Sequence, residues 1–497
     1  MIYEIPNRKF DLIIIGAGVI GCSIARQLSR YKIKVAVLEK NSDVGWGSSG
    51  RNSGVVHAGF NNQPGSLMAS YCVLGNQSFS QIAQELNIPY KKIGKLVVAK
   101  KKEEIKELNK LKKQGETNGV KNLEIIGASE IKKMEANLQG IAALYSPETA
   151  ITSPYHYTIS LAENAWQNGV QFFLDTSVQN IQRIKTNKFV LLTPNVSFET
   201  NYVINCAGVC SDQIAQLVGI NTYRIYPCRG EYFILDKKAS SLINHLIYPV
   251  PHPEEGGLGI HLTPTIDGNV LIGPSNEYIE DREDYSVTME ILNKLCQEAQ
   301  EFLSLISSRY FIANYAGIRA KQTPPNQGGF QDFLIEENPA VPNMINLIGI
   351  ESPGLTAAQP IAEQVVALIE KKEGLTPNPD FNPYHSGILR FAEQDEETKR
   401  RLIKEDPDYG EIICRCEQVT KKEILQAIDN PLAARSLISI KYRSRAMMGR
   451  CQGGYCLTRI MELLKEKYDF KPEDFLLKGP ESHLLTGYRS KGVNNDD

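Results

Sequence analysis

The chain has 497 residues, too many for a single hydrophobic core, so two or three domains are expected. Lys and Arg number 55 against 57 Asp and Glu, and the resulting net charge of −2 gives no reason to expect a nucleic-acid partner. The longest apolar run, residues 12–22, is interrupted by glycines and is too short for a direct transmembrane segment. Because no export signal is recognisable, we expect a cytoplasmic protein whose 10 cysteines stay mostly reduced.

A glycine-rich turn between two apolar runs is the first motif of the chain. Residues 11–15 predict a buried parallel strand, residues 19–29 a helix, and residues 34–38 a second strand that ends on Glu39. The glycines permit a tight turn and close approach of the backbone to a pyrophosphate, and the carboxylate accepts hydrogen bonds from ribose hydroxyls. The three glycines are Gly16, Gly18 and Gly21. This pattern predicts a Rossmann-type unit that binds a dinucleotide, and FAD is favoured over NAD because the motif opens the chain and because of the residues that follow it.

The remainder of the first 385 residues alternates β-rich runs with helical patterns. Residues 48–60 are rich in Gly, Ser and Asn, which indicates a loop, and Pro64 is expected in the first turn of a helix that ends near residue 86. The Lys/Glu-rich residues 100–116 predict a solvated surface helix. Further strands are expected within 170–196, 202–208 and 222–275, and further helices near 286–306 and 356–371.

A change of composition marks the main domain boundary. Residues 391–409 are dense in charge, which indicates a linker or a linking helix. A compact segment that contains four cysteines follows, and residues 490–497 look disordered. The expected organisation is therefore a first region at 9–385, a linker at 386–410, a cysteine-containing domain at 411–470 and a C-terminal tail at 471–497.

A series of short runs, in family order over most of residues 10–375, resembles the glycine-oxidase/D-amino-acid-oxidase superfamily of FAD-dependent flavoproteins. Within that group the chain most resembles L-2-hydroxyglutarate dehydrogenases and FAD-dependent glycerol-3-phosphate dehydrogenases or oxidases. The runs are Gly50–Gly59, Pro64–Leu67, Asn205–Gly208, Cys228–Tyr232, Gly259–Gly268, Ala316–Arg319 and Ser352–Thr356. The resemblance implies an α/β Rossmann-type FAD-binding domain interleaved with an α+β substrate domain. The flavin part would take about 9–80, 150–220 and 320–375, and the substrate part 81–149 and 221–319.

The same resemblance implies where the flavin lies. Ser48, Ser49 and Asn52 would lie along it, and Val178 would hold its adenine end through backbone contacts. Ala207 and Gly208 would border the pyrophosphate. Backbone N–H groups would face the flavin pyrimidine edge, where such donors stabilise the anion that forms on reduction. These donors would come from Gly354, Leu355 and Thr356.

Oxidation of a secondary alcohol needs a hydride acceptor, which the flavin would provide, and a base for the hydroxyl proton. His57 is the expected base, because matching family members carry His there and the ordinary pKa of imidazole suits the task. His57 alternatively only packs beside the cofactor, or attaches the flavin covalently. A phosphate or carboxylate on the substrate calls for arginine, and Arg319 is the leading candidate. Lys321, Arg229 and His261 stand behind it, each with an ion pair or structural role as an equal alternative.

Four cysteines beyond the charged segment form two close pairs. They are Cys414, Cys416, Cys451 and Cys456. Four thiolates can hold a 2Fe-2S cluster or a structural zinc ion, and the tight C-x-C pair is unlike most zinc ribbons. The residues around them, 413–420 and 448–456, resemble the 2Fe-2S module of bacterioferritin-associated ferredoxin, which is also appended to anaerobic glycerol-3-phosphate dehydrogenases. The resemblance implies a small helical iron-sulfur domain.

A flavin and a one-electron cluster on one chain predict a dehydrogenase that relays electrons. The expected substrate is sn-glycerol 3-phosphate, giving dihydroxyacetone phosphate, with L-2-hydroxyglutarate as a close alternative. Amino-acid oxidation and a pure electron-transfer subunit remain further alternatives. We expect an electron-accepting protein subunit as partner, through which the chain would associate with a membrane if it does so.

Overall fold

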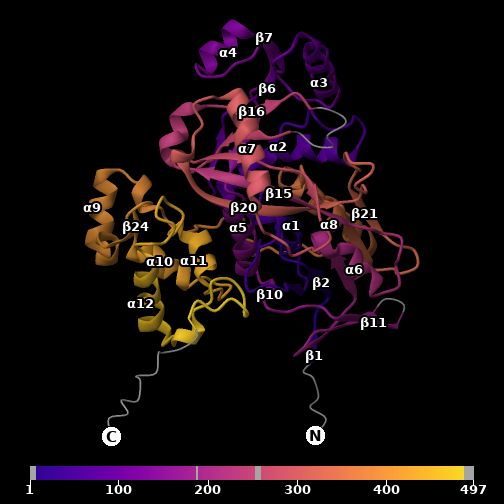
Figure 1. Ribbon diagram of the computed structural model, residues 1–497. Coiled ribbons are helices and arrows are strands. Elements are labelled where there is room, and N and C mark those ends of the chain that lie inside the picture. Colours follow the sequence, from indigo (N-terminus) through magenta and orange to yellow (C-terminus); the bar gives the residue numbers. More distant parts are fainter. Residues whose placement is uncertain (1–6, 186–187, 252–258, 486–497) are drawn as a thin grey trace, which may run out of the picture. The chain divides into compact units, whose positions relative to one another are not determined.

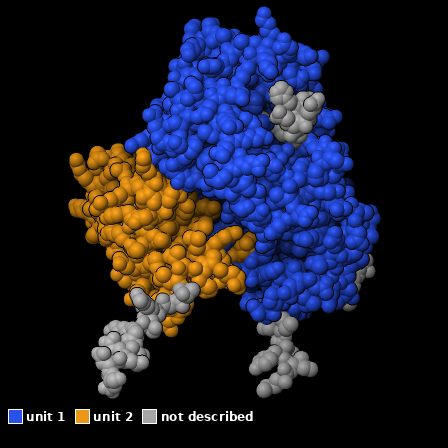
Figure 2. All heavy atoms as spheres, viewed as in Figure 1, with its two compact units in different colours: residues 1–40, 44–387 blue, residues 41–43, 388–497 orange. Residues whose placement is uncertain are grey.

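The computed structural model describes residues 7–185, 188–251 and 259–485 (Figure 1). The chain divides into two compact units, Met1–Lys40 with Val44–Gly387, and Asn41–Asp43 with Ile388–Asp497 (Figure 2). No helix in the described ranges is both long enough and apolar enough to cross a membrane.

A six-stranded sheet organises the amino-terminal part of the first unit. Its order is β10-β3-β2-β14-β22-β21, and the first five strands run parallel. The four central strands are buried along their whole length, as expected of a parallel sheet with both faces covered. The strands are β2 (Leu12–Ile15), β3 (Val35–Leu38), β10 (Gln171–Phe173), β14 (Tyr202–Asn205), β21 (Leu334–Glu337) and β22 (Met344–Ile348).

A nine-stranded sheet forms the second layer of this unit. Its order is β19-β15-β18-β17-β16-β6-β8-β7, and β20 pairs with β15 over the length of both strands. The pairs are antiparallel except β16 with β6, which is typical of a substrate domain built from consecutive hairpins. The strands are β6 (Lys95–Ala99), β7 (Glu124–Gly127), β8 (Ala142–Ser146), β15 (Tyr226–Leu235), β16 (Leu246–Pro249), β17 (His261–Pro264), β18 (Val270–Gly273), β19 (Glu277–Tyr278) and β20 (Phe311–Lys321).

Two smaller sheets complete the strands of the first unit. One has the order β1 (Asn7–Lys9), β13 (Ser197–Thr200), β12 (Lys188–Leu192) and β11 (Asn180–Lys185), and the other β4 (Val55–Val56), β9 (Ala150–Thr152) and β5 (Tyr90–Lys92). Because both large sheets draw strands from separated stretches of chain, the predicted interleaving of a flavin domain with a substrate domain is confirmed.

Helix α8 is a long helix of the first unit that packs against two other helices. It spans Gly354–Glu373 and packs against α1 and α2. A Cβ on Gly75 would lie 1.9 Å from the carbonyl oxygen of Thr356, so only glycine lets α2 approach this closely. The helices of the unit are α1 (Val19–Leu28), α2 (Leu67–Glu85), α3 (Ile105–Thr117), α4 (Ala128–Met134), α5 (Pro154–Gln167), α6 (Ser211–Gln216), α7 (Met289–Phe302) and α8.

Two local predictions for this unit were wrong in detail. Helix α2 begins at Leu67 and not at Pro64, because the hydroxyl of Ser66 caps the helix by accepting a hydrogen bond from the backbone N–H of Ala69. Helix α3 exists as predicted, but it is not solvated all round. Leu108 and Leu111 are buried, since one face of the helix packs on the core beneath it.

The second unit is small and mostly helical, as predicted. Residues 388–410 are not a free linker: Phe391, Leu402 and Tyr409 form a buried cluster that belongs to this unit. The predicted tail also begins too early, because Phe475 is buried in the main core of the unit. Residues 490–497 lie outside the described residues. The elements are α9 (Glu396–Glu405), β23 (Ile412–Cys414), β24 (Val419–Thr420), α10 (Lys421–Ile428), α11 (Leu437–Ser444) and α12 (Leu457–Tyr468).

Candidate active site and cluster site

The glycine motif closes a tight turn between β2 and α1. Gly16 has φ +101°, and a Cβ there would lie 2.6 Å from the carbonyl oxygen of Cys206. A Cβ on Gly21 would lie 2.0 Å from the carbonyl oxygen of Gly16, so the turn and the helix touch through backbone alone. One carboxylate oxygen of Glu39 accepts the backbone N–H of Ala17 at 2.8 Å. Glu39, the predicted ribose-binding residue, therefore also fixes the turn. Gly18 is the N-cap of α1 and has no side chain to cap the helix.

The loop at residues 48–52, which follows β3, is held in place by hydrogen bonds of its own side chains. The amide of Asn52 donates to the carbonyl oxygens of Ser48 at 3.0 Å and Ser49 at 2.8 Å. The Ser49 hydroxyl accepts the backbone N–H of Val19 at 2.9 Å, and the Ser48 hydroxyl donates to the carbonyl of Ile318. These bonds hold the loop against the start of α1 and against β20, where Ser48 and Asn52 line a cavity.

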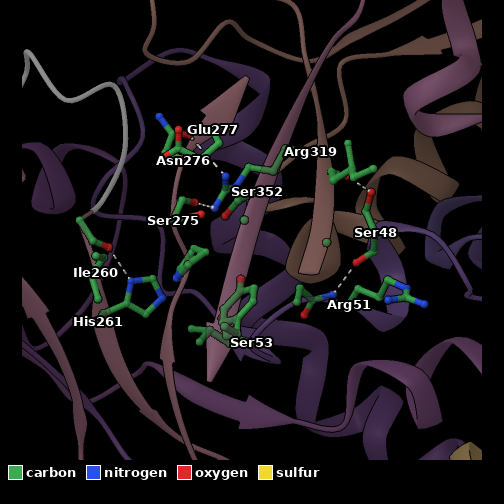
Figure 3. A pocket seen from close by; sticks show the side chains of 18 of the residues that line it. Ser48, Arg51, Ser53, Ile260, His261, Ser275, Asn276, Glu277, Arg319 and Ser352 are labelled. Carbon is green, nitrogen blue, oxygen red and sulfur yellow. Dashed lines mark hydrogen bonds between the residues drawn. The ribbon is translucent and has the colours of Figure 1, made fainter. Parts of the chain in front are cut away.

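That cavity, of about 420 Å³, lies within the first unit and is lined by strands of the nine-stranded sheet, by the loop at residues 48–57 and by the segment at 352–355 (Figure 3). Ser48 and Arg51 lie on one side of it, and His261 on the other. Its size and its few polar groups on apolar walls are typical of a site for a cofactor and a small substrate. Four of the five predicted catalytic residues line this cavity together with Tyr248: His57, His261, Arg319 and Lys321.

His57 reaches the cavity from the segment after β4. Its backbone N–H donates to the hydroxyl of Thr356 at 3.0 Å, which ties the residue to the first turn of α8. Burial, reinforced by the charge of Lys95, lowers the pKa of His57 from 6.5 to about 3. The imidazole is therefore neutral at physiological pH, which is the state in which a base can accept a proton.

His261 stands on β17 with 5% of its surface exposed. Its Nδ1–H donates to the carbonyl oxygen of Gly259 at 2.9 Å, and its ring stacks on Tyr248 with centroids 3.8 Å apart. Burial lowers the pKa of His261 well below 6.5, and nearby positive groups lower it further. A neutral imidazole that carries its proton on Nδ1 offers only an acceptor at Nε2.

Arg319 stands on β20 and reaches toward Ser275 and Asn276 (Figure 3). It donates to the carbonyl oxygen of Ser275 at 3.1 Å, to the amide oxygen of Asn276 at 3.4 Å and to the sulfur of Cys228 at 3.7 Å. These acceptors are uncharged, so the guanidinium keeps its positive charge available to an anion in the cavity.

The two other predicted cations are occupied by carboxylates. Lys321 is 1% exposed in its side chain, and its ammonium lies 3.2 Å from Glu351 and 2.8 Å from the carbonyl oxygen of Gly329. Arg229 forms ion pairs with Glu231 and Asp284, and the structure does not place it on the cavity wall formed by the described residues. Arg229 therefore fits the structural alternative that the sequence left open, whereas Lys321 lines the cavity with its charge already paired.

The predicted flavin-edge donors lie at the start of α8. Leu355 lines the cavity, but the N–H of Gly354 donates to the carbonyl oxygen of Glu351 at 2.5 Å. Toward the pyrophosphate side, Gly208 has φ +56° and begins a short turn, and Ala207 donates to the side-chain oxygen of Asn205 at 3.3 Å. Val178 packs on the hydrophobic core beneath the six-stranded sheet.

Sequence reasoning missed Lys95, Tyr248, Ser275 and Asn276. Lys95 opens an apolar strand, where a lysine normally indicates an exposed end. Ser275 and Asn276 follow the cis Gly273–Pro274 bond in a turn that no motif distinguishes. Their proximity to Arg319 depends on the pairing of β15 with β20, which the sequence alone does not specify.

The four cysteines of the second unit meet as two pairs. Cys414 shares a thiol hydrogen bond with Cys456, and this bond lowers the pKa of Cys414 to about 6; Cys416 contacts Cys451. In the described ranges, no group of three or more His, Cys, Asp or Glu residues is close enough for a single metal ion. Four thiols in two neighbouring pairs fit a cluster with two irons, each held by two thiolates.

Backbone groups and packing prepare this loop for a cluster. Burial opposes ionisation of Cys451, but the backbone N–H groups of Tyr455 and Gly453 donate to its sulfur and lower its pKa overall. A Cβ on Gly449 would lie 2.3 Å from the Cβ of Cys416, so only glycine fits beside that thiolate. Backbone N–H groups thus stabilise the thiolate of Cys451 before any cluster binds.

The nearby basic residues do not simply balance an anionic cluster. Arg443 is buried in a two-bonded ion pair with Asp43, at 2.5 Å and 3.1 Å. Arg445 pairs with Glu417 at 3.0 Å. These two charges are therefore largely neutralised inside the unit.

Comparison with known proteins agrees with this geometry. Residues 11–368 match the model of the family described as FAD dependent oxidoreductase. The chain belongs to this family. Residues 412–466 match the BFD-like [2Fe-2S] binding domain. The cofactors are accordingly FAD and a 2Fe-2S cluster, and the predicted family resemblance and fold class are confirmed.

Individual relatives span different shares of the chain. A glycerol 3-phosphate dehydrogenase from Caloramator mitchellensis is 39% identical over 487 residues, covering 96% of this chain and 98% of the relative. A mitochondrial L-2-hydroxyglutarate dehydrogenase from Arabidopsis thaliana is 34% identical and covers 73% of this chain and 83% of the relative. The FAD-bound, dithionite-reduced L-alpha-glycerophosphate oxidase from Mycoplasma pneumoniae superposes with a TM-score of 0.71 at 29% identity, covering 76% of this chain and 98% of that one. The first relative thus matches both units, whereas the others match about three quarters of the chain.

Proposed function

We propose that the chain oxidises sn-glycerol 3-phosphate to dihydroxyacetone phosphate and passes the electrons from FAD through the 2Fe-2S cluster to a partner protein. One cavity carries the proposal, because it combines Arg319, whose acceptors are uncharged, with two neutral histidines, His57 and His261. The Caloramator relative named glycerol 3-phosphate dehydrogenase supports it, since that match includes the cluster unit.

Each residue in the cavity has a separate task. FAD, when bound, supplies the acceptor for the hydride that leaves the carbon of the alcohol. His57 would take the proton from the hydroxyl oxygen, because its imidazole is neutral and lines the cavity. Arg319 would hold the phosphate through its guanidinium. The glycine turn at Gly16 and the carboxylate of Glu39 would hold the pyrophosphate and ribose of the cofactor.

His261 favours this substrate over the hydroxy-diacid. With Nδ1 committed to the carbonyl of Gly259, its ring can only accept a hydrogen bond at Nε2. Glycerol 3-phosphate offers a second hydroxyl that can donate to it. L-2-hydroxyglutarate has a carboxylate at the equivalent carbon, which would place two acceptors against each other.

L-2-hydroxyglutarate is the second candidate substrate. Its support is the series of relatives of that name, which includes the Arabidopsis protein at 34% identity. An amino-acid substrate has no comparable support, since the glycine oxidase of Geobacillus kaustophilus matches at 21% identity and indicates only the shared fold. A pure electron-transfer role would leave the assembly of His57 and Arg319 in one cavity without a use.

An anaerobic titration separates these candidates. The purified, iron-reconstituted protein would be titrated with glycerol 3-phosphate and, separately, with L-2-hydroxyglutarate and glycine, while the flavin absorbance is followed. We expect bleaching at stoichiometric glycerol 3-phosphate and little with the others. Bleaching by L-2-hydroxyglutarate in preference would assign the second candidate. No bleaching with any of them would support the electron-transfer role and contradict the proposal.

The cluster unit suggests how electrons leave. Cys416 and Cys451 are exposed, whereas Cys414 and Cys456 are buried, so one edge of the cluster would lie at the surface. Arg415 is exposed beside this edge and lies 4.3 Å above the ring of Tyr455, which is 38% exposed. An exposed cation on an aromatic ring beside a redox centre suits an acidic electron-carrier protein, whose approach it would steer.

Charge reversal tests this part of the proposal. Arg415→Glu should slow electron transfer to an acidic flavodoxin about tenfold at low salt and leave transfer to ferricyanide unchanged. Arg401→Glu, on the exposed side of α9, is the matched control. Equal rates for Arg415→Glu and the control would contradict an acidic partner at this edge.

A further inference from the structure

Lys95 is the most unusual charged residue of the first unit. It begins β6 inside the nine-stranded sheet, pairing with Ser146 on β8 and Leu246 on β16, and is 1% exposed. Its ammonium finds no hydrogen-bond acceptor among the described residues. A buried ammonium without a partner is strongly unfavourable, so a lysine retained here calls for a reason.

The ammonium of Lys95 makes cation–π contacts with aromatic rings instead of an ion pair with a carboxylate. Nζ lies 3.5 Å from the centre of the Tyr248 ring and 4.9 Å from that of Phe60. The ring of His261 stacks on Tyr248 at 3.8 Å, nearly parallel. Two groups this close to one ring cannot share a face, so Tyr248 lies between Lys95 and His261. The lysine is therefore one ring away from the cavity.

The groups that surround Lys95 carry no negative charge. They are His57 beyond β4, Cys72 on α2, Tyr248 on β16 and His261 on β17, with Arg319 on β20 acting on His261 as well. Cys72 stays a thiol, because burial raises its pKa to about 12, and its S–H donates to the carbonyl of His57. The positive charge of the ammonium thus acts on both histidines with no carboxylate among these groups to offset it.

We propose that Lys95 is a positioning residue whose buried ammonium, seated on the ring of Tyr248, adds to burial in keeping His57 and His261 in their neutral forms. Neutrality serves both tasks assigned above: His57 must accept a proton, and His261 must offer a lone pair at Nε2. This inference rests on the proposed alcohol oxidation in this cavity.

The charge of Lys95 is present over the range where it is needed. Burial lowers the pKa of Lys95 from 10.5 to about 7. Below that pH, where an ordinary histidine with a pKa of 6.5 begins to protonate, Lys95 carries its charge and opposes a second positive charge beside it. The charge of Lys95 therefore adds to burial in opposing protonation of the histidines.

This arrangement makes a specific prediction for stability. The folded pKa lies below the unfolded one, so the buried charge destabilises the fold fully below about pH 7, and this effect disappears as the pH rises toward 10.5. Replacing Lys95 by methionine removes the charge and keeps a chain of similar length. The variant should therefore unfold at a higher temperature than the wild type near pH 6, with a smaller difference near pH 9.

The experiment compares Lys95→Met and Lys95→Leu with Lys100→Met. Lys100 also lies over an aromatic ring, Phe302 at 3.7 Å, but it is partly exposed and does not line the cavity formed by the described residues. Anaerobic flavin reduction by glycerol 3-phosphate and thermal unfolding would both be followed across pH. We expect the Lys95 variants to move the acidic limb of kcat/KM up by about one pH unit, a tenfold loss on that limb, while raising the unfolding temperature. Lys100→Met should do neither.

Several results would overturn the inference. Lower stability or failure to fold in both Lys95 variants would show a structural role. Higher stability with an unchanged acidic limb would show that the histidines do not need the charge. If the wild type is not reduced by glycerol 3-phosphate at any pH, the proposed function fails, and the unfolding comparison still decides whether Lys95 is charged in the fold.

Discussion

The cavity of the first unit and the cysteine loops of the second differ in how far their positively charged side chains are paired with carboxylates. Arg319 in the cavity and Lys95 behind its wall have no carboxylate among the acceptors that the structure gives them, and the two histidines stay neutral. In the cysteine loops, Arg443 and Arg445 are paired with carboxylates, and backbone N–H groups approach the thiolates. Proton and anion chemistry needs unbalanced charge, whereas a one-electron centre needs sulfurs held by fixed dipoles.

The proton-accepting side of this comparison is tested most strongly at His57. His57→Gln keeps a polar side chain but removes the base, and we expect the rate of flavin reduction by glycerol 3-phosphate to fall by about 10²- to 10⁴-fold. Because burial and Lys95 lower the pKa of His57 to about 3, the wild-type kcat/KM should stay flat well below pH 6.5. Stopped-flow reduction across pH measures both. A reduction rate in the variant within a few-fold of the wild type would exclude His57 as the base.

The anion-binding side is tested at Arg319. Arg319→Met removes the guanidinium beside Ser275 and Asn276, and we expect KM for glycerol 3-phosphate to rise by about 10²-fold or more with a smaller effect on kcat. Arg229→Met is the matched control, since its charge is consumed by Glu231 and Asp284. A larger rise in KM for the control than for Arg319→Met would place the anion elsewhere.

The hydrogen-bond acceptor Nε2 of His261 is expected to affect the preference between the two substrates more than the rate of oxidation. His261→Gln can offer an N–H where the wild type offers only a lone pair, so the ratio of kcat/KM between glycerol 3-phosphate and L-2-hydroxyglutarate should fall by about tenfold. Parallel assays with the two substrates measure this ratio. An unchanged ratio would mean that His261 does not contact the part of the substrate that distinguishes them.

The smallest expected effect concerns the scaffold alone. Ser66→Ala removes the cap of α2 and should cost about 1 kcal/mol of unfolding free energy. Pro64→Ala, two residues earlier, should change the stability less, since Pro64 lies outside the helix. Chemical denaturation of both variants measures the difference. A larger loss for Pro64→Ala would restore the helix start that the sequence had indicated.

The sequence predicted the parts of the molecule that depend on local pattern. The βαβ unit, several of the longer helices and the cysteine pairs follow from periodicity and spacing, and the structure contains them, whereas α4, α5 and α6 were not predicted. The sequence ranked Arg319 ahead of Arg229 and Lys321 but could not tell which of these cations is paired, because only the folded sheets decide which cation meets a carboxylate. The sequence did not predict that Lys95 is buried for the same reason: its neighbours Tyr248 and His261 lie about 150 residues away along the chain.

The central claim is that the first unit oxidises the substrate and the second unit accepts the electrons. It is tested most directly by rapid anaerobic mixing of glycerol 3-phosphate with the wild type and with Cys416→Ser. Flavin absorbance reports the first unit, and the EPR signal of the reduced cluster reports the second. We predict flavin reduction at the same rate in both proteins, followed by the cluster signal in the wild type alone. Loss of flavin reduction in Cys416→Ser, or a cluster signal that precedes flavin bleaching in the wild type, would contradict the account.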